Sequence, residues 1–116
     1  MPTHHKINYL EIPAADLDGT KAFFQQAFDW QFTDYGPDYS CFTNGGLDGG
    51  FYRAKDSATV AGGSLLMVLY SKDLQQSQQQ VEAAGGKIIK PVFSFPGGRR
   101  FHFADPSGNE YAIWSE

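Results

Sequence analysis

Apolar residues recur at helical spacing twice along the chain, about half a chain length apart. The first run is Leu17, Phe23, Phe24, Ala27 and Phe28, and the second is Leu74, Val81 and Ala84. Asp16 and Asp73 stand immediately before these runs, where an aspartate accepts hydrogen bonds from the first backbone N–H groups of a helix. The pattern therefore predicts two helices, the second ending at Gly85-Gly86.

Short apolar segments flank each predicted helix and predict strands, one before the helix and three after it. These strands are residues 7–12, 31–33, 39–43 and 49–53 in the first half, and residues 65–70, 87–90, 99–104 and 110–114 in the second. Pro13 is expected to end the first strand. Asp105-Pro106-Ser107-Gly108 predicts a tight turn, and Pro96-Gly97-Gly98 the turn that presents Arg99 and Arg100.

The order strand–helix–strand–strand–strand thus occurs twice, and an internal repeat takes precedence over other fold assignments. We predict one α+β domain over residues 1–116, with a first module over about residues 1–54 and a second over about residues 62–116. A chain of 116 residues can bury a real core, and ten Phe, six Tyr and two Trp predict that this core is rich in aromatic rings.

Charge and cysteine content narrow the expected partners. The net charge is −4 and Arg99-Arg100 is the only adjacent basic pair, so we expect no nucleic-acid partner. Cys41 is the only cysteine, which excludes an intramolecular disulfide and favours a reducing compartment. No apolar run reaches transmembrane length and the N-terminus lacks a signal segment, so we expect a cytoplasmic protein with no membrane partner.

Several segments together carry a family resemblance. They are Ile12-Pro13-Ala14-Ala15-Asp16-Leu17, Ala22-Phe23-Phe24, Phe28-Asp29-Trp30, Ala83-Ala84-Gly85-Gly86 and Phe103-Ala104-Asp105-Pro106-Ser107-Gly108-Asn109-Glu110. With the repeat, they resemble the vicinal-oxygen-chelate superfamily, which includes glyoxalase I, bleomycin-resistance proteins, fosfomycin-modifying enzymes and extradiol dioxygenases. The resemblance covers nearly the whole chain. It implies two βαβββ modules whose mixed sheets form a cup around a small ligand, with the helices outside. It also implies a homodimer, because two-module relatives commonly pair.

Metal-dependent relatives hold a divalent ion with His, Glu or Gln side chains from the module strands. The resemblance places these ligand positions at Tyr9 (or Asn8, if the strand is bulged), near Met67, near Gly49-Gly50 and at Ala112. Alanine and methionine do not bind a hard divalent ion, and tyrosine rarely does. We therefore expect no metal at the usual site and no other cofactor, and a metal held by displaced ligands remains the alternative.

Side-chain alternation along the predicted strands collects polar residues on one face. The apolar positions Leu10, Ile12, Phe101, Phe103, Tyr111 and Ile113 suit the core. The residues left facing the cup are Tyr9, Glu11, Arg100, His102, Glu110 and Trp114.

These residue types suggest chemistry in the cup. Glu11 and Glu110 could act as general bases, and His102 could carry a proton near neutral pH. Arg100 could pair with an anionic substrate or an enolate oxygen, while Tyr9, Met67 and Trp114 would contact the ligand. An equally open interpretation is a salt-bridge network that neutralises Arg100. In either case a carboxylate, Glu11 or Glu110, should lie within salt-bridge reach of a buried Arg100.

Three functions remain open, because this fold supports several unrelated chemistries. The first is a metal-independent enzyme, a lyase or isomerase, that uses the acid–base residues of the cup. The second is a binding protein that sequesters an aromatic or cationic molecule, as bleomycin-resistance proteins do, with Trp30, Trp114 and the tyrosines as stacking surfaces. The third is a metal-dependent enzyme of glyoxalase type with displaced ligands, for instance His102 with Glu11 or Glu110.

Overall fold

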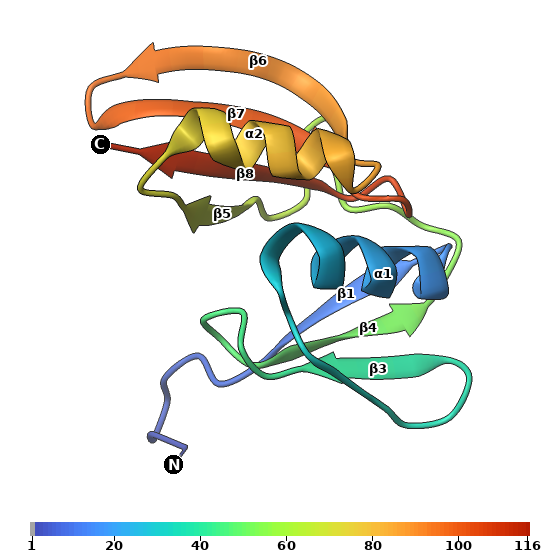
Figure 1. The fold of residues 1–116 in the computed structure, drawn as a ribbon. Helices are drawn as coiled ribbons and strands as arrows, with labels where there is room; N and C mark the ends of the chain where they lie inside the picture. The colour runs from blue at the N-terminus through green and yellow to red at the C-terminus, as the bar shows by residue number, and fades with distance from the viewer. Residues whose placement is uncertain (1) are drawn as a thin grey trace.

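The computed structural model describes residues 2–116, which form two successive βαβββ modules (Figure 1). The first module consists of β1 (Leu10–Ala14), α1 (Leu17–Phe28), β2 (Phe32–Asp34), β3 (Tyr39–Phe42) and β4 (Gly49–Arg53). The second consists of β5 (Met67–Tyr70), α2 (Leu74–Ala83), β6 (Lys87–Phe95), β7 (Gly98–Ala104) and β8 (Glu110–Ser115). The predicted α+β fold with two tandem modules is confirmed.

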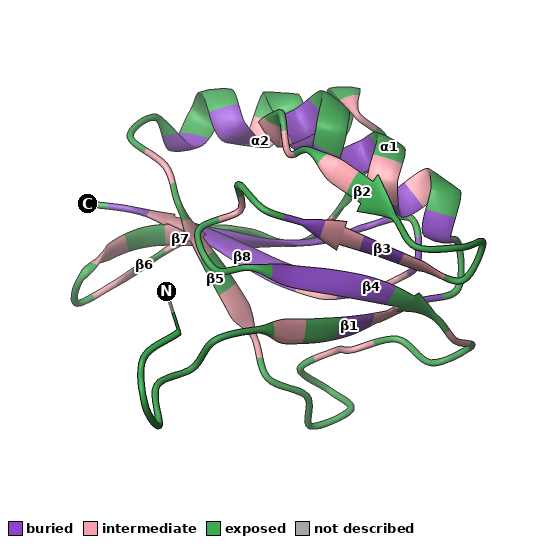
Figure 2. Ribbon diagram, turned by 90° about the horizontal axis from the view of Figure 1, so that it is seen from below, coloured by how far each residue is buried: buried purple, intermediate pink, exposed green. Residues whose placement is uncertain are grey.

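Each module forms its own four-stranded mixed sheet. The first sheet has the order β1-β4-β3-β2 and the second the order β5-β8-β7-β6, and the two sheets do not close into one barrel. In each sheet the first strand of the module pairs in parallel with the last, and the other pairs are antiparallel. Both helices lie on the same side of the sheets (Figure 2), so each sheet has a helix-covered face and a helix-free face.

The helices begin and end as the local sequence predicts. A carboxylate oxygen of Asp16 accepts a hydrogen bond from the backbone N–H of Gly19 at 3.0 Å, and Asp73 caps the second helix in the same way. At the end of α2, Gly85 adopts a φ of 95°, which glycine reaches without strain. Within residues 2–116, no helix is long and apolar enough to span a membrane.

Two strands continue beyond their predicted ends, and each passes through a proline. The backbone N–H of Leu10 donates to the carbonyl of Asp48, on the side of β4. Backbone nitrogens alternate sides along a strand, so that of Pro13 faces the other side, the open edge of the sheet. A proline there costs no hydrogen bond between strands. The expectation that Pro13 ends the strand is therefore wrong. Strand β6 likewise passes through Pro91 at the edge of the second sheet, with irregular pairing on both sides of Lys90.

One aromatic core joins the two modules. Phe24 on α1 is fully buried, and its ring centroid lies 4.5 Å from that of Trp30 and 5.3 Å from that of Tyr111 on the second sheet. The Phe23 ring similarly lies 5.7 Å from Phe103. Because α1 packs on rings from both halves, neither module has a complete core alone.

The turn at residues 105–109 links the modules through hydrogen bonds. The Asn109 side chain donates to the Pro13 carbonyl at 2.6 Å and accepts from the Ala58 N–H at 2.8 Å. The Ser107 hydroxyl accepts from the Asp16 N–H at 2.9 Å, next to the start of α1. The carboxylate of Asp105 accepts four hydrogen bonds from Ser107, Asn109 and Tyr111 and so stabilises the turn. Its burial raises the pKa of this carboxyl despite these bonds. These residues of the family-like segment therefore serve packing between the modules.

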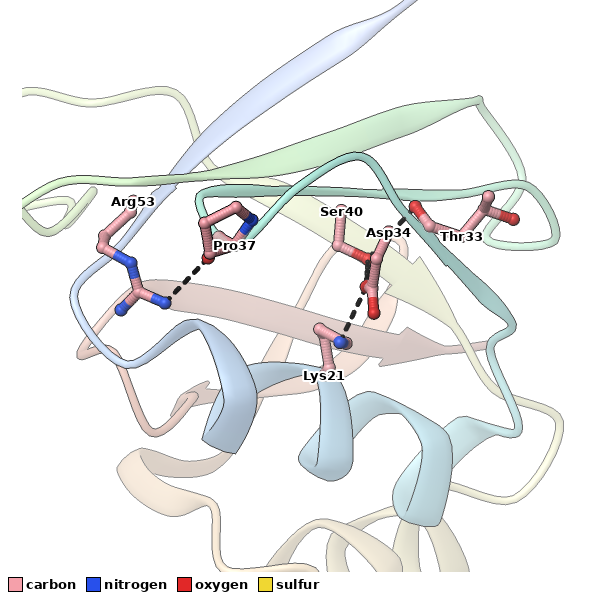
Figure 3. A network of polar contacts seen from close by, with 6 residues as sticks. All are labelled: Lys21, Thr33, Asp34, Pro37, Ser40 and Arg53. Carbon is pink, nitrogen blue, oxygen red and sulfur yellow. Dashed lines mark hydrogen bonds and ion pairs between the residues drawn. The ribbon is translucent and has the colours of Figure 1, made fainter.

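A second polar network fixes α1 on the first sheet (Figure 3). Asp34 accepts from the Lys21 ammonium at 2.7 Å and from the Ser40 hydroxyl at 2.7 Å. At the other end of the hairpin, Arg53 donates to the Pro37 carbonyl at 2.9 Å. The bond from Lys21 lowers the pKa of Asp34.

Candidate functional site

The helix-free face of the second sheet carries most of the predicted site. Phe101, Phe103, Tyr111 and Ile113 are buried on the helix-covered side, as the alternation predicts. On the opposite face, Arg100 pairs in register with Trp114, and His102 with Ala112. The same rows continue outward, to Tyr70 and Val68 on β5 and to Phe93 and Lys90 on β6.

His102 and Glu110 form a hydrogen-bonded pair on this face. Nδ1 of His102 lies 2.8 Å from Oε2 of Glu110, and their side chains are only 3% and 11% exposed. Burial alone would raise the pKa of Glu110. The bonds from His102 and the Val60 N–H, together with the nearby charge of Lys90, outweigh burial and lower that pKa. An ionised Glu110 accepts a hydrogen bond from the N–H at Nδ1, which leaves Nε2 of a neutral imidazole as a hydrogen-bond acceptor.

The Nε2 atom of His102 is buried and has no hydrogen-bond partner. The Phe93 ring packs near this imidazole, with the two ring centroids 5.8 Å apart. Buried polar atoms in folded proteins are nearly always paired, so an unpaired one next to an ionised carboxylate calls for a functional explanation.

Arg100 lies between two phenylalanines instead of beside a carboxylate. Its Cζ lies 5.4 Å from the Phe93 ring and 5.6 Å from the Phe95 ring. None of the ion pairs within residues 2–116 includes Arg100, so the predicted salt bridge with Glu11 or Glu110 is not formed. The physical reason is that Glu110 is engaged by His102, and Glu11 belongs to the other sheet.

The aromatic residues around Arg100 escaped the sequence analysis. Phe93 and Phe95 lie on the part of β6 beyond residue 90, where no strand was predicted. The alternation Phe93-Ser94-Phe95 before the Pro96-Gly97 turn is a hairpin signal that could have revealed them. Trp114, which was predicted, packs against Phe95 and Tyr70, with ring centroids 6.4 and 5.2 Å away.

Tyr9 and Glu11 have their polar partners at the first sheet. The Tyr39 hydroxyl donates to Oε2 of Glu11 at 3.0 Å and lies 2.6 Å from the Tyr9 hydroxyl. Burial and the bond with Tyr39 raise the pKa of Tyr9. Glu11 and Met67 line a cavity of about 330 Å³ between β1 and β5, whose lining includes none of the predicted site residues of β7 and β8.

Comparison with known families agrees with this architecture. Residues 6–113 match the Glyoxalase/Bleomycin resistance protein/Dioxygenase superfamily. The chain belongs to this superfamily. No curated protein matches the sequence.

Solved structures of the superfamily share the fold at low identity. A glyoxalase-related enzyme from Fulvimarina pelagi has 19% identity and a TM-score of 0.79, covering 97% of this chain and 88% of that one. The fosfomycin resistance protein FosX from Listeria monocytogenes has 17% identity and a TM-score of 0.79, covering 100% and 95%. Lactoylglutathione lyase from Agrobacterium tumefaciens has 17% identity and a TM-score of 0.74, covering 98% and 95%. At these identities the likeness concerns the fold alone.

The donor set of this superfamily member does not fit the divalent ion that metal-dependent relatives hold. The positions that the resemblance assigns to ligands carry Tyr9, Met67 and the fully buried Ala112. Within residues 2–116, no three His, Cys, Asp or Glu side chains come together in a way that could hold a metal. His102 and Glu110 bond to each other, which leaves a pair where at least three protein ligands are usual.

Proposed function

We propose that this protein is a small-molecule enzyme that moves a proton with His102, oriented by Glu110, and needs no metal. The observation that carries the proposal is the 2.8 Å bond between Nδ1 of His102 and Glu110, with Nε2 buried and unpaired. A carboxylate that fixes one ring nitrogen presents the other to a substrate and stabilises the imidazolium that forms after proton transfer.

The chemistry that suits this pair is lyase or isomerase chemistry beside a carbonyl group. Nε2 takes the proton from a carbon next to the carbonyl, and the electron pair of the C–H bond passes to the carbonyl oxygen as an enolate. Arg100, two residues along the same face, is placed to stabilise this negative charge. If the carbon that loses the proton bears a hydroxyl group, transfer of the hydroxyl proton to the enolate oxygen and return of the abstracted proton from Nε2 to the former carbonyl carbon complete an isomerisation. If the carbon on its other side bears a leaving group, departure of that group with its electron pair completes an elimination, and Nε2 gives its proton to the leaving group.

Substrate reaches Nε2 by displacing the Phe93 side chain. Phe93 belongs to the edge strand β6, whose pairing with β7 is irregular between Lys90 and Phe93. Movement there breaks fewer backbone bonds than it would in a central strand, because an edge strand is bonded on one side only.

The test uses protein freed of metal by a chelator and a panel of small hydroxy- and keto-carboxylates in D₂O. Exchange of the carbon-bound proton for deuterium is followed by NMR. Wild type should catalyse exchange, His102→Gln should abolish it, and Glu110→Gln should reduce it by about 10²-fold or more, the usual scale of general base catalysis. Exchange that persists in His102→Gln would overturn the role of His102. Activity that requires added zinc, nickel or iron, or about one such ion per chain by elemental analysis, would overturn metal independence.

A ligand-sequestering role is the second candidate, favoured by the aromatic residues on the same face. Phe93, Phe95, Trp114 and Tyr70 offer ring surfaces without requiring any reaction. The same NMR experiment separates the two functions, because a sequestering protein broadens or shifts ligand signals without exchanging protons.

We also propose a homodimer in which the helix-free face of the first sheet covers that of the second sheet in the other copy. Tyr9 and Tyr52 on the first face and Tyr70 on the second leave large apolar surfaces exposed, which supports this pairing of faces. A monomer-sized particle by light scattering at micromolar concentration would contradict this arrangement. A reducing, cytoplasmic location belongs to the same proposal, supported by the single free thiol of Cys41.

A further inference from the structure

Two buried nitrogen atoms without partners belong to side chains on the helix-free face of the second sheet. They are Nε of Arg100 and Nε2 of His102, the two unpaired buried side-chain atoms in the described part of the chain. One residue separates Arg100 from His102 on β7, so both side chains leave the strand on the same face. Unpaired buried nitrogens lower stability unless a bound molecule supplies the missing partners, so the geometry points to a ligand at this place.

The charges on this face favour an anionic ligand. Arg100 and Lys90 are basic, and both contact the Phe93 ring, at 5.4 and 5.3 Å from its centroid. Two carboxylates lie at this face: Glu110 already accepts from His102, and Glu116 accepts from the Tyr70 hydroxyl at 3.0 Å. Both of these carboxylates are thus engaged by other side chains, whereas Arg100 has no ion-pair partner within residues 2–116, so its charge is available to an anion.

The surroundings of Arg100 favour an anion that carries a flat apolar ring. The guanidinium of Arg100 contacts the rings of Phe93 and Phe95, and its planar fork suits a carboxylate. Trp114, directly opposite Arg100 in register, and Tyr70, which is 54% exposed, continue the row toward β5. A small inorganic anion would use Arg100 and leave these rings uncovered, whereas an aromatic acid would use both.

We infer that this face binds an aromatic carboxylate, with the carboxylate on Arg100 and the ring against Trp114 and Tyr70. The inference names the substrate class for the enzyme proposed above and takes its catalytic meaning from that proposal. Binding itself depends on Arg100 and the aromatic row and does not require His102 to act as a base.

The test measures binding of four probes by isothermal titration calorimetry: benzoate, its neutral analogue benzamide, acetate and inorganic phosphate. Benzoate should bind at least about tenfold more tightly than benzamide, because a charged hydrogen bond is lost with the carboxylate. Benzoate should also bind more tightly than acetate and phosphate, because these two anions lack the ring. Quenching of tryptophan fluorescence by benzoate should disappear in Trp114→Phe, since the other tryptophan, Trp30, stacks on Phe24 and Phe42 of the first module, away from Arg100.

Arg100→Gln should weaken benzoate binding at least about tenfold. Arg99→Gln is the matched control, because it removes the same charge from an exposed neighbour on the opposite face and should leave the affinity unchanged. If Arg100→Gln does not fold, Arg100→Lys replaces it, because lysine keeps the charge without the planar fork. Arg100→Lys should weaken the binding of benzoate more than the binding of phosphate.

The outcomes separate this inference from the proposed function. Equal affinity for benzoate and benzamide, or unchanged affinity in Arg100→Gln, overturns the assignment to Arg100 whatever the deuterium exchange shows. Phosphate or acetate binding as tightly as benzoate overturns the role of the aromatic row. Tight benzoate binding that depends on Arg100, with no proton exchange in any substrate, supports this inference and refutes the acid–base enzyme.

Discussion

The inter-module contacts of Asn109 allow a quantitative prediction of stability. Asn109 is 1% exposed, and its side chain bonds the backbone of Pro13 and of Ala58 as well as Asp105. Asn109→Ala leaves the Pro13 carbonyl and the Ala58 N–H without a partner, at a cost of about 1–3 kcal/mol for each fully buried group. Because both residues are half-buried, we expect the free energy of unfolding to fall by about 2–4 kcal/mol.

Asn44 provides a matched control for the assay, which is equilibrium unfolding in urea. Its side chain also bonds two backbone groups, the N–H of Gln31 at 2.7 Å and the carbonyl of Asp29 at 3.0 Å, but it is exposed. Water replaces these bonds in Asn44→Ala, so the expected loss is below about 1 kcal/mol. Both variants should retain the wild-type dependence on urea, since neither changes the surface exposed on unfolding.

A loss for Asn109→Ala no larger than that for Asn44→Ala would refute the reasoning. It would mean that the bonds of Asn109 to the other module contribute no net stability. Asn109→Asp refines the test, because it keeps an acceptor for Ala58 but sets a second carboxylate beside Asp105. We expect it to destabilise at least as strongly as the alanine variant.

Three further predictions concern stability. Phe24→Ala should lower the free energy of unfolding in urea by about 3–5 kcal/mol, because this fully buried ring contacts both modules. Gly98→Ala should lower the melting temperature, since a Cβ there would collide with the Ser115 carbonyl at a φ of 152°. Lys21 lowers the pKa of Asp34, so their pair stabilises the fold above the ordinary carboxyl pKa and loses this effect as pH falls through the lowered value. The melting temperature of Asp34→Asn should therefore lie below that of wild type at pH 7 and approach it in acid.

The features that could be predicted from the sequence are those with a local physical cause. The aspartates at positions 16 and 73 and the glycines after the second helix mark helix ends through contacts within a few residues. Alternation along β7 and β8 likewise placed Arg100 and His102 on the face opposite the core, because side chains of neighbouring strand residues always point to opposite sides.

The features that were missed depend on contacts distant in the sequence. Whether Pro13 ends a strand depends on its strand lying at a sheet edge, which the residues around it do not specify. The neighbours of Arg100 depend on how far β6 extends. The pairing of β6 with β7 is irregular on both sides of Lys90, so the length of β6 could not be predicted from regular alternation. The cost of burying an unpaired charge predicted a carboxylate beside Arg100. In the structure, two phenylalanine rings contact it instead.

The hydrogen bond from Asn109 to Pro13 has a consequence for the order of folding. It joins positions 96 residues apart, whereas the β6–β7 hairpin closes through the two-residue Pro96-Gly97 loop. Closing a long loop costs more chain entropy than closing a short one, so contacts between distant residues tend to form late. The hairpin that presents Arg100 can thus form early, while docking of the two modules needs Asn109 and Tyr111, which come later in the sequence. A nascent chain that lacks its last strand would expose Phe24 and its neighbours until Tyr111 arrives to cover them.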